Sequence, residues 1–364
     1  MLVGLVTTGF PRFEGDHSGA FLLTLARALV AQGHQVRVLG PEPRRRRPAP
    51  RWPGIEVTWV PYLRPRALQQ TFYGSGAPEN LRTTRPASWA GAASFTAALR
   101  IAARRRLEDC DALVSSWCLP SGWAASAAAE GRTHLCICHA TDVRWLERLP
   151  GGGALARQVA AGATSMWFLS AALRARFFDL AALPSGSMPT HLGPMPIEAP
   201  LPLGIDRELL RCRLGIEGFT VLFLGRLVPV KGVRDLLFAI ASMPERVSIR
   251  IAGDGPDRAA LMALARRLKV DATFEGWVAS ERKEALLRAC DAMVVPSHAG
   301  DGLPTVLFEA RARDLPVVAT RAGAIADTLK GSSDAFLVPP GDRAALGRAM
   351  EALRAQQAAK AFRA

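Results

Sequence analysis

Two cationic side chains lie in one short loop of this 364-residue sequence. The segment from Leu222 to Leu237 reads LFLGRLVPVKGVRDLL, in which an apolar run ends at Gly225 and a helical pattern begins after Gly232. Arg226 and Lys231 therefore lie between a strand and a helix. Open α/β sheets bind ligands at the carboxyl ends of their strands, and a helix N-terminus adds backbone N–H donors. The pattern predicts an anion site of diphosphate size; two solvated cations on a turn are the alternative.

A second segment, from Val294 to Thr320, carries two carboxylates eight residues apart, Asp301 and Glu309. Pro304 lies between them and suits the first position of a helix. The first amides of such a helix are unpaired donors, here those of Leu303, Thr305 and Val306. Amides between two carboxylates match a diphosphate flanked by hydroxyl groups, as in a sugar nucleotide. Alternatively, Asp301 caps the helix and Glu309 is a solvated helix residue.

Three further segments follow expected strands. The segment Ile251–Leu261, IAGDGPDRAAL, predicts a tight glycine turn, but it lacks the dinucleotide and P-loop patterns. His139 opens the sequence HATD, where it could bond a hydroxyl group or transfer a proton, although a lone histidine is more often structural. Gly15 and Gly19 in the loop Thr7–Phe21 would let the backbone approach a substrate closely, unless that loop is simply surface.

Strand and helix patterns alternate along the chain. At the N-terminus, the apolar run Met1–Thr7, the helical pattern Phe21–Gln32 and the run Gln35–Gly40 form a β-loop-α-β unit. Such units build parallel, doubly wound sheets with helices on both faces. The alternation restarts at Phe219, so the sequence predicts two α/β units of similar size.

A proline-rich segment separates the two halves. Leu183–Pro202 cannot continue a helix or a central strand, because proline lacks the backbone donor. We place the junction there, extending to about Gly215, and expect one domain over residues 1–200 and another over residues 201–364. Two such domains facing a cleft would offer a ligand site.

The composition is that of a globular chain, with 49% hydrophobic and 21% charged residues. The net charge of +14 favours anionic partners, although the excess of arginine could equally reflect genomic base composition. No cysteine spacing indicates a zinc site, and Cys136 and Cys138 are expected to be buried thiols in a reducing compartment. The longest uncharged stretch, Ala112–Ala129, contains proline and glycine and is a poor membrane span. These features predict a cytoplasmic protein.

Taken together, the motifs resemble the GT4 family of retaining glycosyltransferases, which have the GT-B fold of two Rossmann-like domains. The second half is similar through GRLVPVKG, AGDGP, FEGWV and VVPSHAGDGLPTVLFEA, and the first half more loosely through TTGFPRFEGDHSG, SSWCLPSG, HATD and PLGID. The resemblance implies an N-terminal acceptor-binding domain and a C-terminal domain that binds a UDP-, GDP- or ADP-sugar. It implies transfer to a glycan or lipid-linked saccharide, with no cofactor and no nucleic-acid partner.

The resemblance also implies roles for individual residues. Arg226 and Lys231 would bind the donor phosphates, Glu309 the ribose and Asp301 the transferred sugar. His139 would lie near the sugar's 6-hydroxyl and would complete a catalytic set with Asp301, Arg226 and Lys231. The FEGWV stretch would frame the base. The remaining donor contacts implied are Gly15, Gly225, Gly276, Trp277, Val278, Gly302, Leu303, Pro304 and Thr305.

Three features depart from the family pattern. Position 301 is Asp where Glu is usual, and its shorter side chain could shift the sugar contact or lower activity. Arg311, Arg313 and Asp314 replace the small residues that usually follow the second carboxylate, which makes that helix unusually charged. The chain ends at Ala364, where the family's further C-terminal helix looks shortened or absent, so domain closure is open to question.

The resemblance and the residues together suggest a mechanism. The sequence shows no carboxylate that is identifiable as a covalent nucleophile and no D-x-D motif near the site, so we expect metal-independent transfer. Arg226, Lys231 and the helix at Pro304 would stabilise the departing diphosphate while the acceptor attacks the same face. One alternative is a weak or inactive nucleotide-sugar-binding protein of a polysaccharide assembly system. An epimerase is another, which the combined motifs argue against.

Membrane contact is a separate hypothesis. The segment Ser94–Leu107 combines Phe95, Leu99 and Ile101 with four arginines, and a basic amphipathic helix can lie on the anionic inner face of a membrane. The arginine run at residues 44–47 could also bind headgroups. The alternative is a helix that faces the core and exposes only its arginines.

Overall fold

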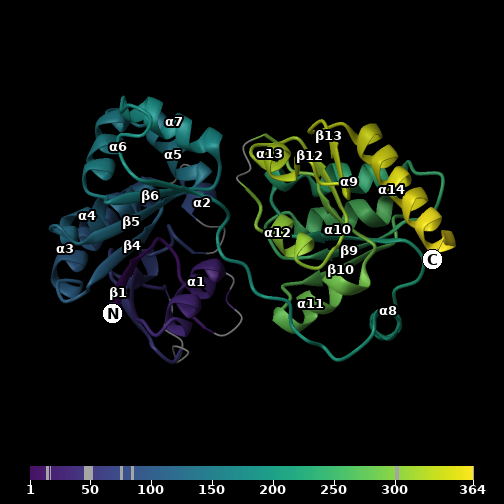
Figure 1. The fold of residues 1–364 in the computed structure, drawn as a ribbon, viewed down its shortest axis with the longest axis horizontal. Helices are drawn as coiled ribbons and strands as arrows, with labels where there is room; N and C mark the ends of the chain where they lie inside the picture. The colour runs from purple at the N-terminus through teal and green to yellow at the C-terminus, as the bar shows by residue number, and fades with distance from the viewer. Residues whose placement is uncertain are drawn as a thin grey trace. The chain divides into compact units, whose positions relative to one another are not determined.

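The computed structural model describes residues 1–13, 16, 18–44, 52–73, 77–82, 86–299 and 303–363. The chain divides into two compact units, Met1–Pro196 and Ile197–Ala364 (Figure 1). Gly15, Asp301 and Gly302 lie outside the described residues, so their expected roles stay predictions.

The described residues of unit 1 form a seven-stranded parallel sheet in the order β3-β2-β1-β4-β5-β6-β7. Its strands are β1 (Leu2–Val6), β2 (Gln35–Pro41), β3 (Ile55–Val60), β4 (Ala112–Ser116), β5 (Thr133–Cys138), β6 (Ser165–Phe168) and β7 (Thr190–Leu192). The order reverses between β1 and β4, which is the switch point where open sheets bind ligands. The short edge strand β7 lies inside the proline-rich segment, as edge strands tolerate proline nearby.

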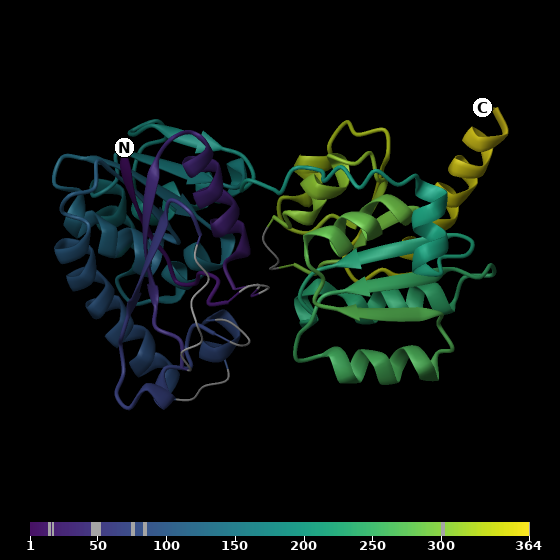
Figure 2. The same ribbon diagram turned by 90° about the horizontal axis from the view of Figure 1, so that it is seen from below.

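Helices cover both faces of this sheet (Figure 2). They are α1 (Ala20–Ala31), α2 (Ala77–Arg82), α3 (Pro86–Arg106), α4 (Trp123–Ala129), α5 (Ala140–Arg148), α6 (Gly152–Ala161) and α7 (Ala171–Ala181), with shorter turns at Arg66–Leu68 and Cys118–Gly122. Cys136 and Cys138 are buried free thiols, as expected. No described helix has both the length and the apolar character that crossing a bilayer requires.

The apolar residues of α3 do not form one exposed stripe. Phe95 and Leu99 are completely buried in the core, one helical turn apart, whereas Ile101 is 53% exposed. Phe95 and Leu99 therefore belong to the core of unit 1. An apolar stripe on α3 that includes them and faces a membrane is excluded.

The described residues of unit 2 form a six-stranded parallel sheet in the order β10-β9-β8-β11-β12-β13. Its strands are β8 (Thr220–Leu224), β9 (Ser248–Ala252), β10 (Ala272–Gly276), β11 (Ala292–Val295), β12 (Val317–Thr320) and β13 (Ala335–Val338). Its helices are α8 (Arg207–Leu214), α9 (Val233–Ala241), α10 (Arg258–Arg267), α11 (Ser280–Ala289), α12 (Val306–Arg311), α13 (Ile325–Leu329) and α14 (Arg343–Arg363), with a short turn at Pro229–Lys231. The prediction of two doubly wound α/β units is confirmed.

Several elements of unit 2 were not predicted, among them α8 and α14. The segment of α8 was assigned to the junction, yet Leu210 and Leu214 are buried in the core of unit 2. The helix α14 packs Leu346, Met350 and Leu353 into the core on the other face of the sheet. Both elements therefore belong to the unit that carries the expected anion site.

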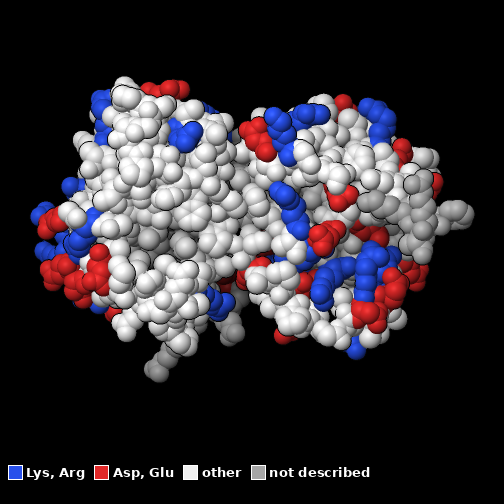
Figure 3. Space-filling model, in the orientation of Figure 1, with Lys and Arg blue, Asp and Glu red and all other residues white. Residues whose placement is uncertain are grey.

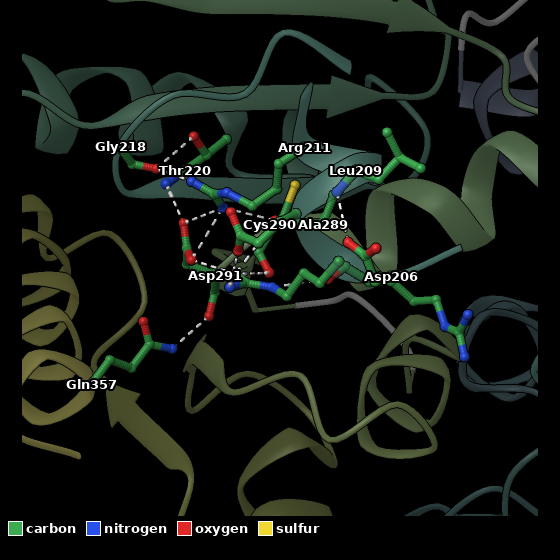
Figure 4. Close-up of polar contacts among 12 residues, drawn as sticks. Asp206, Leu209, Arg211, Gly218, Thr220, Ala289, Cys290, Asp291 and Gln357 are labelled. Atoms are coloured by element: carbon green, nitrogen blue, oxygen red, sulfur yellow. Dashed lines mark hydrogen bonds and ion pairs between the residues drawn. The ribbon is translucent and has the colours of Figure 1, made fainter. Parts of the chain in front are cut away.

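One residue, Asp291, joins both of these helices to the amino edge of the sheet, through its carboxylate for α8 and its backbone carbonyl for α14. Asp291, directly before β11, accepts a hydrogen bond from the Thr220 amide (2.7 Å) and ion pairs with Arg207 (2.5 Å) and Arg211 (3.2 Å) of α8 (Figure 4). The Asp291 carbonyl accepts a hydrogen bond from Gln357 of α14 (2.7 Å). Asp291 therefore joins α8, β8, β11 and α14 at the edge opposite the expected anion site.

The charges of the described residues are mixed on the surface. Over unit 2, the face drawn in Figure 3 shows basic and acidic side chains beside one another. Several arginines are paired, such as Arg250 (3.1 Å) and Arg282 (2.7 Å), which both contact Glu275. This face does not present the continuous basic surface that binds a nucleic-acid backbone.

Replacing Asp291 with alanine should lower the free energy of unfolding of unit 2 by about 2–4 kcal/mol. The change removes the acceptor of the Thr220 amide and the counter-ion of the mostly buried Arg211. Urea unfolding of the full chain measures the effect. Glu217→Ala, which removes an exposed carboxylate, should change the value by less than about 0.5 kcal/mol. Equal destabilisation by the two variants would contradict the anchoring role of Asp291.

Candidate active site

The loop between β8 and α9 is fixed by main-chain hydrogen bonds to the end of β9 and to the turn after it. The Gly225 amide donates to the Ala252 carbonyl (3.0 Å), and the Leu227 amide donates to the Asp254 carbonyl (2.9 Å). A side chain at Gly253 would place its Cβ 1.8 Å from the Gly225 oxygen. Only glycine permits this approach, so the turn AGDGP serves to hold the loop that carries Arg226 and Lys231.

The same loop also contacts the loop after β11. The His298 amide donates to the Val230 carbonyl (2.8 Å), and a Cβ at Gly232 would lie 1.9 Å from the Pro296 oxygen. Gly232 has a φ of 69°, which also favours glycine. Because the strand order reverses between β8 and β11, half-buried Arg226 and Lys231 lie at the switch point of unit 2.

The segment after β10 joins this group of loops. The Gly253 amide donates to the Gly276 carbonyl (2.7 Å). Trp277 is 48% exposed, whereas Val278 is buried in the core. Of the three residues expected around a base, Trp277 therefore offers an aromatic surface, and the Val278 side chain supports the fold.

The helix that follows the loop after β11 begins later than expected. The helix α12 starts at Val306 with Thr305 at its N-cap, and the buried Pro304 precedes it. A turn directly after Pro304 leads into this helix, because the Leu307 amide donates to the Pro304 carbonyl (3.2 Å). The placement of Pro304 at the first helical position is wrong. With six residues, α12 also aligns few peptide dipoles toward a ligand.

Glu309 is not a solvated helix residue. It is 8% exposed, and its Oε1 lies 3.1 Å from Nζ of Lys283, which also lies 2.9 Å from Oε2 of Glu198. Burial alone would lower the pKa of Lys283, but the two carboxylates outweigh it and raise that pKa. Within the described part of the chain, the buried Oε2 of Glu309 has no hydrogen-bond donor. No sequence signal indicated Lys283, which lies on α11 outside every motif.

Family models match both units of the chain. Residues 218–356 match the family model of glycosyl transferases group 1, and residues 18–186 match that of the glycosyl transferase 4-like domain. The chain belongs to the GT4-type glycosyltransferases. Its two units are the two halves of their GT-B fold.

Two curated relatives and one solved structure illustrate the similarity. The chain is 27% identical over 66% of its length to the putative teichuronic acid biosynthesis glycosyltransferase TuaC of Bacillus subtilis. It is 30% identical over 56% of its length to the GDP-mannose-dependent alpha-(1-6)-phosphatidylinositol monomannoside mannosyltransferase of Mycobacterium tuberculosis. These matches span 60% and 56% of the relatives' own lengths. The structure of Anabaena Alr3699/HepE in complex with UDP has a TM-score of 0.69 at 17% identity, covering 98% of this chain and 91% of that chain.

In unit 1, the HATD sequence lies where β5 ends at the sheet's carboxyl edge. His139 is the N-cap of α5, and its Nε2 lies 3.0 Å from Oγ of Ser116, at the end of β4. Burial lowers the pKa of His139 to about 4, so the ring is neutral at pH 7. A neutral ring suits hydrogen bonding to a hydroxyl group.

Asp142, the last residue of HATD, has a structural explanation. It is 1% exposed and accepts hydrogen bonds from the amides of Cys118 (2.7 Å) and Val143 (2.9 Å). Burial raises the pKa of Asp142 to about 6. Asp142 therefore joins the SSWCLPSG segment to the start of α5 and fixes the backbone beside His139.

Arg313, one of the departures from the family pattern, is buried. Its guanidinium donates two hydrogen bonds to Oε2 of Glu284 (2.6 and 2.8 Å) and one to the carbonyl of Glu309 (3.0 Å). Arg313 lies beyond the last residue of α12, Arg311, and fixes the backbone of Glu309.

Proposed function

We propose that this chain transfers a sugar from a nucleotide-sugar donor to a hydroxyl group of a glycan or lipid-linked saccharide, with retention and without a metal ion. The observation that carries the proposal is the convergence of the loops after β8, β9, β10 and β11 at the switch point of unit 2. The relative that is named as GDP-mannose-dependent and the structure that holds UDP support a nucleotide-sugar as the donor. Unit 2 would bind the donor and unit 1 the acceptor.

Each group of the donor has a matching residue in unit 2. Arg226 and Lys231 would bind the diphosphate, Trp277 would cover one face of the base, and Oε2 of Glu309 would accept a hydrogen bond from the ribose. Asp301 would contact the transferred sugar. The remaining donor contacts that are expected in unit 2 are Gly225, Gly276, Gly302, Leu303, Pro304 and Thr305.

Charge stabilisation would be the main catalytic effect. As the bond between sugar and diphosphate breaks, negative charge grows on the diphosphate beside Arg226 and Lys231, which are held in place before the reaction. The acceptor hydroxyl would attack the face that the diphosphate leaves. His139, as a neutral ring, would hold a sugar hydroxyl by a hydrogen bond.

Lys231→Ala should reduce transfer from the donor by about 100- to 1000-fold, because it removes one of the two cations beside the departing diphosphate. The assay measures transfer and donor hydrolysis with UDP-, GDP- and ADP-sugars in the presence of EDTA. Lys330→Ala, which changes an exposed lysine, is the matched control. Unchanged transfer by Lys231→Ala would refute the assignment. A wild-type chain that binds a nucleotide-sugar without transferring it would instead be the binding protein considered as the alternative.

We also propose peripheral contact of unit 1 with an anionic membrane through the outer face of α3. That face carries the exposed Trp89 and Ile101 and the exposed Arg104 and Arg105, which combine apolar contact with cationic charge. Wild-type chain should sediment with vesicles that contain phosphatidylglycerol at low salt and should be released at high salt. Replacing both arginines with glutamate should abolish the binding, and absence of binding by the wild-type chain would refute the proposal.

A further inference from the structure

Lys283 lies between two carboxylates of unit 2 and has no role in the functions described above. Its Nζ contacts Oε1 of Glu309 on α12 and Oε2 of Glu198 in the segment before α8. The Lys283 side chain is 17% exposed. The ammonium therefore occupies one oxygen of the carboxylate that the proposed function places at the ribose.

The second carboxylate oxygen of Glu309, Oε2, remains available to accept a hydrogen bond from a ligand. Oε2 is buried and has no donor among the described residues. A buried acceptor without a donor is costly, and a ligand that supplies the donor removes that cost. Since Lys283 holds Oε1, an incoming hydroxyl group is directed to Oε2.

The helix α11 fixes both the side chain and the backbone of Glu309. Lys283 holds the carboxylate, and the adjacent Glu284 holds Arg313, which donates to the Glu309 carbonyl. The pair of Arg313 and Glu284 is buried, with side-chain exposures of 3% and 1%. Glu309 therefore cannot turn toward a ligand freely, because two contacts define its position.

The positive charge of Lys283 has a second effect. A lone carboxylate close to a diphosphate would repel it, since like charges in a poorly solvated site interact strongly. Lys283 offsets the charge of Glu309 without occupying Oε2. The carboxylate can then accept a hydrogen bond from a hydroxyl group without weakening the binding of the phosphates.

We infer that Lys283 is a positioning residue that holds Glu309 so that Oε2 receives a ribose hydroxyl, and that it thereby makes the site selective for ribonucleotides over deoxyribonucleotides. The inference rests on the proposed function, because it requires a nucleotide in the unit 2 site. Lys283 lies outside the sequence motifs. Its proposed role lets the site distinguish ribose from deoxyribose in the nucleotide, which binding of the phosphates alone does not do.

The test compares the dissociation constants of a nucleoside diphosphate and its 2′,3′-dideoxy analogue, measured by calorimetry on the full chain. UDP, GDP and ADP are tried first, and the one that binds the wild-type chain most tightly is used. The wild-type chain should prefer the ribonucleotide by about tenfold or more, because the analogue leaves a charged acceptor unpaired. In Lys283→Met, both nucleotides lose the charge that offsets Glu309, but the ribonucleotide should lose more affinity than the analogue, so that the ratio falls toward one.

Two further variants separate positioning from structural damage. Lys283→Arg keeps the charge and the donors and should restore part of the preference, which provides a test even if Lys283→Met folds poorly. Glu198→Gln changes the other partner of Lys283 and should keep the wild-type ratio, because Glu309 remains paired. Equal weakening of both nucleotides in Lys283→Met, or an unchanged ratio, would overturn the inference.

The wild-type result distinguishes this inference from the proposed function. A wild-type chain that binds none of the three nucleoside diphosphates would refute the proposed function and the inference with it. A wild-type chain that binds both nucleotides equally would leave the proposed function intact and refute only the role of Lys283.

Discussion

Main-chain hydrogen bonds between neighbouring strand ends and loops position Arg226, Lys231 and Trp277 of the candidate donor site. The amides of Gly225, Leu227, Gly253 and His298 each donate to a carbonyl at the end of a neighbouring strand or in a neighbouring loop, at the carboxyl edge of unit 2. These bonds depend on glycine at positions 232 and 253, where any side chain would overlap a carbonyl oxygen. Arg226, Lys231 and Trp277 are thus presented by a backbone arrangement that exists before a ligand binds, which is what electrostatic stabilisation of a leaving group requires.

The sequence predicted the features that depend on local pattern. Apolar runs followed by glycine loops and helical periodicity located both sheets, and the position of Arg226 and Lys231 between strand and helix indicated the edge at which they lie. The sequence did not predict the contacts between distant residues. Lys283 and Glu309 lie 26 positions apart on different helices, and periodicity alone treats both as solvated. The pairing of Arg313 with Glu284 was also not predicted, because Glu284 comes from α11.

Two errors at helix boundaries have local causes. Pro304 suits the first position of a helix, but the described backbone turns at Thr305, and α12 ends before Asp314, whose φ is 51°. The helix α8 was missed although its signals are present. Asp206 caps it by accepting from the Leu209 amide (2.8 Å), and Gly215 ends it. The many prolines before it favoured a linker, and only the burial of Leu210 and Leu214 shows that tertiary packing determines the outcome.

The central claim is that the loops at the switch point of unit 2 bind the diphosphate of a nucleotide-sugar. A crystal structure of the full chain with a bound nucleoside diphosphate tests it most directly. We expect the phosphate oxygens within hydrogen-bonding distance of Arg226 and Lys231, with the ribose at Glu309. A diphosphate bound elsewhere, for example beside Arg207 at the opposite edge of the sheet, would contradict the account.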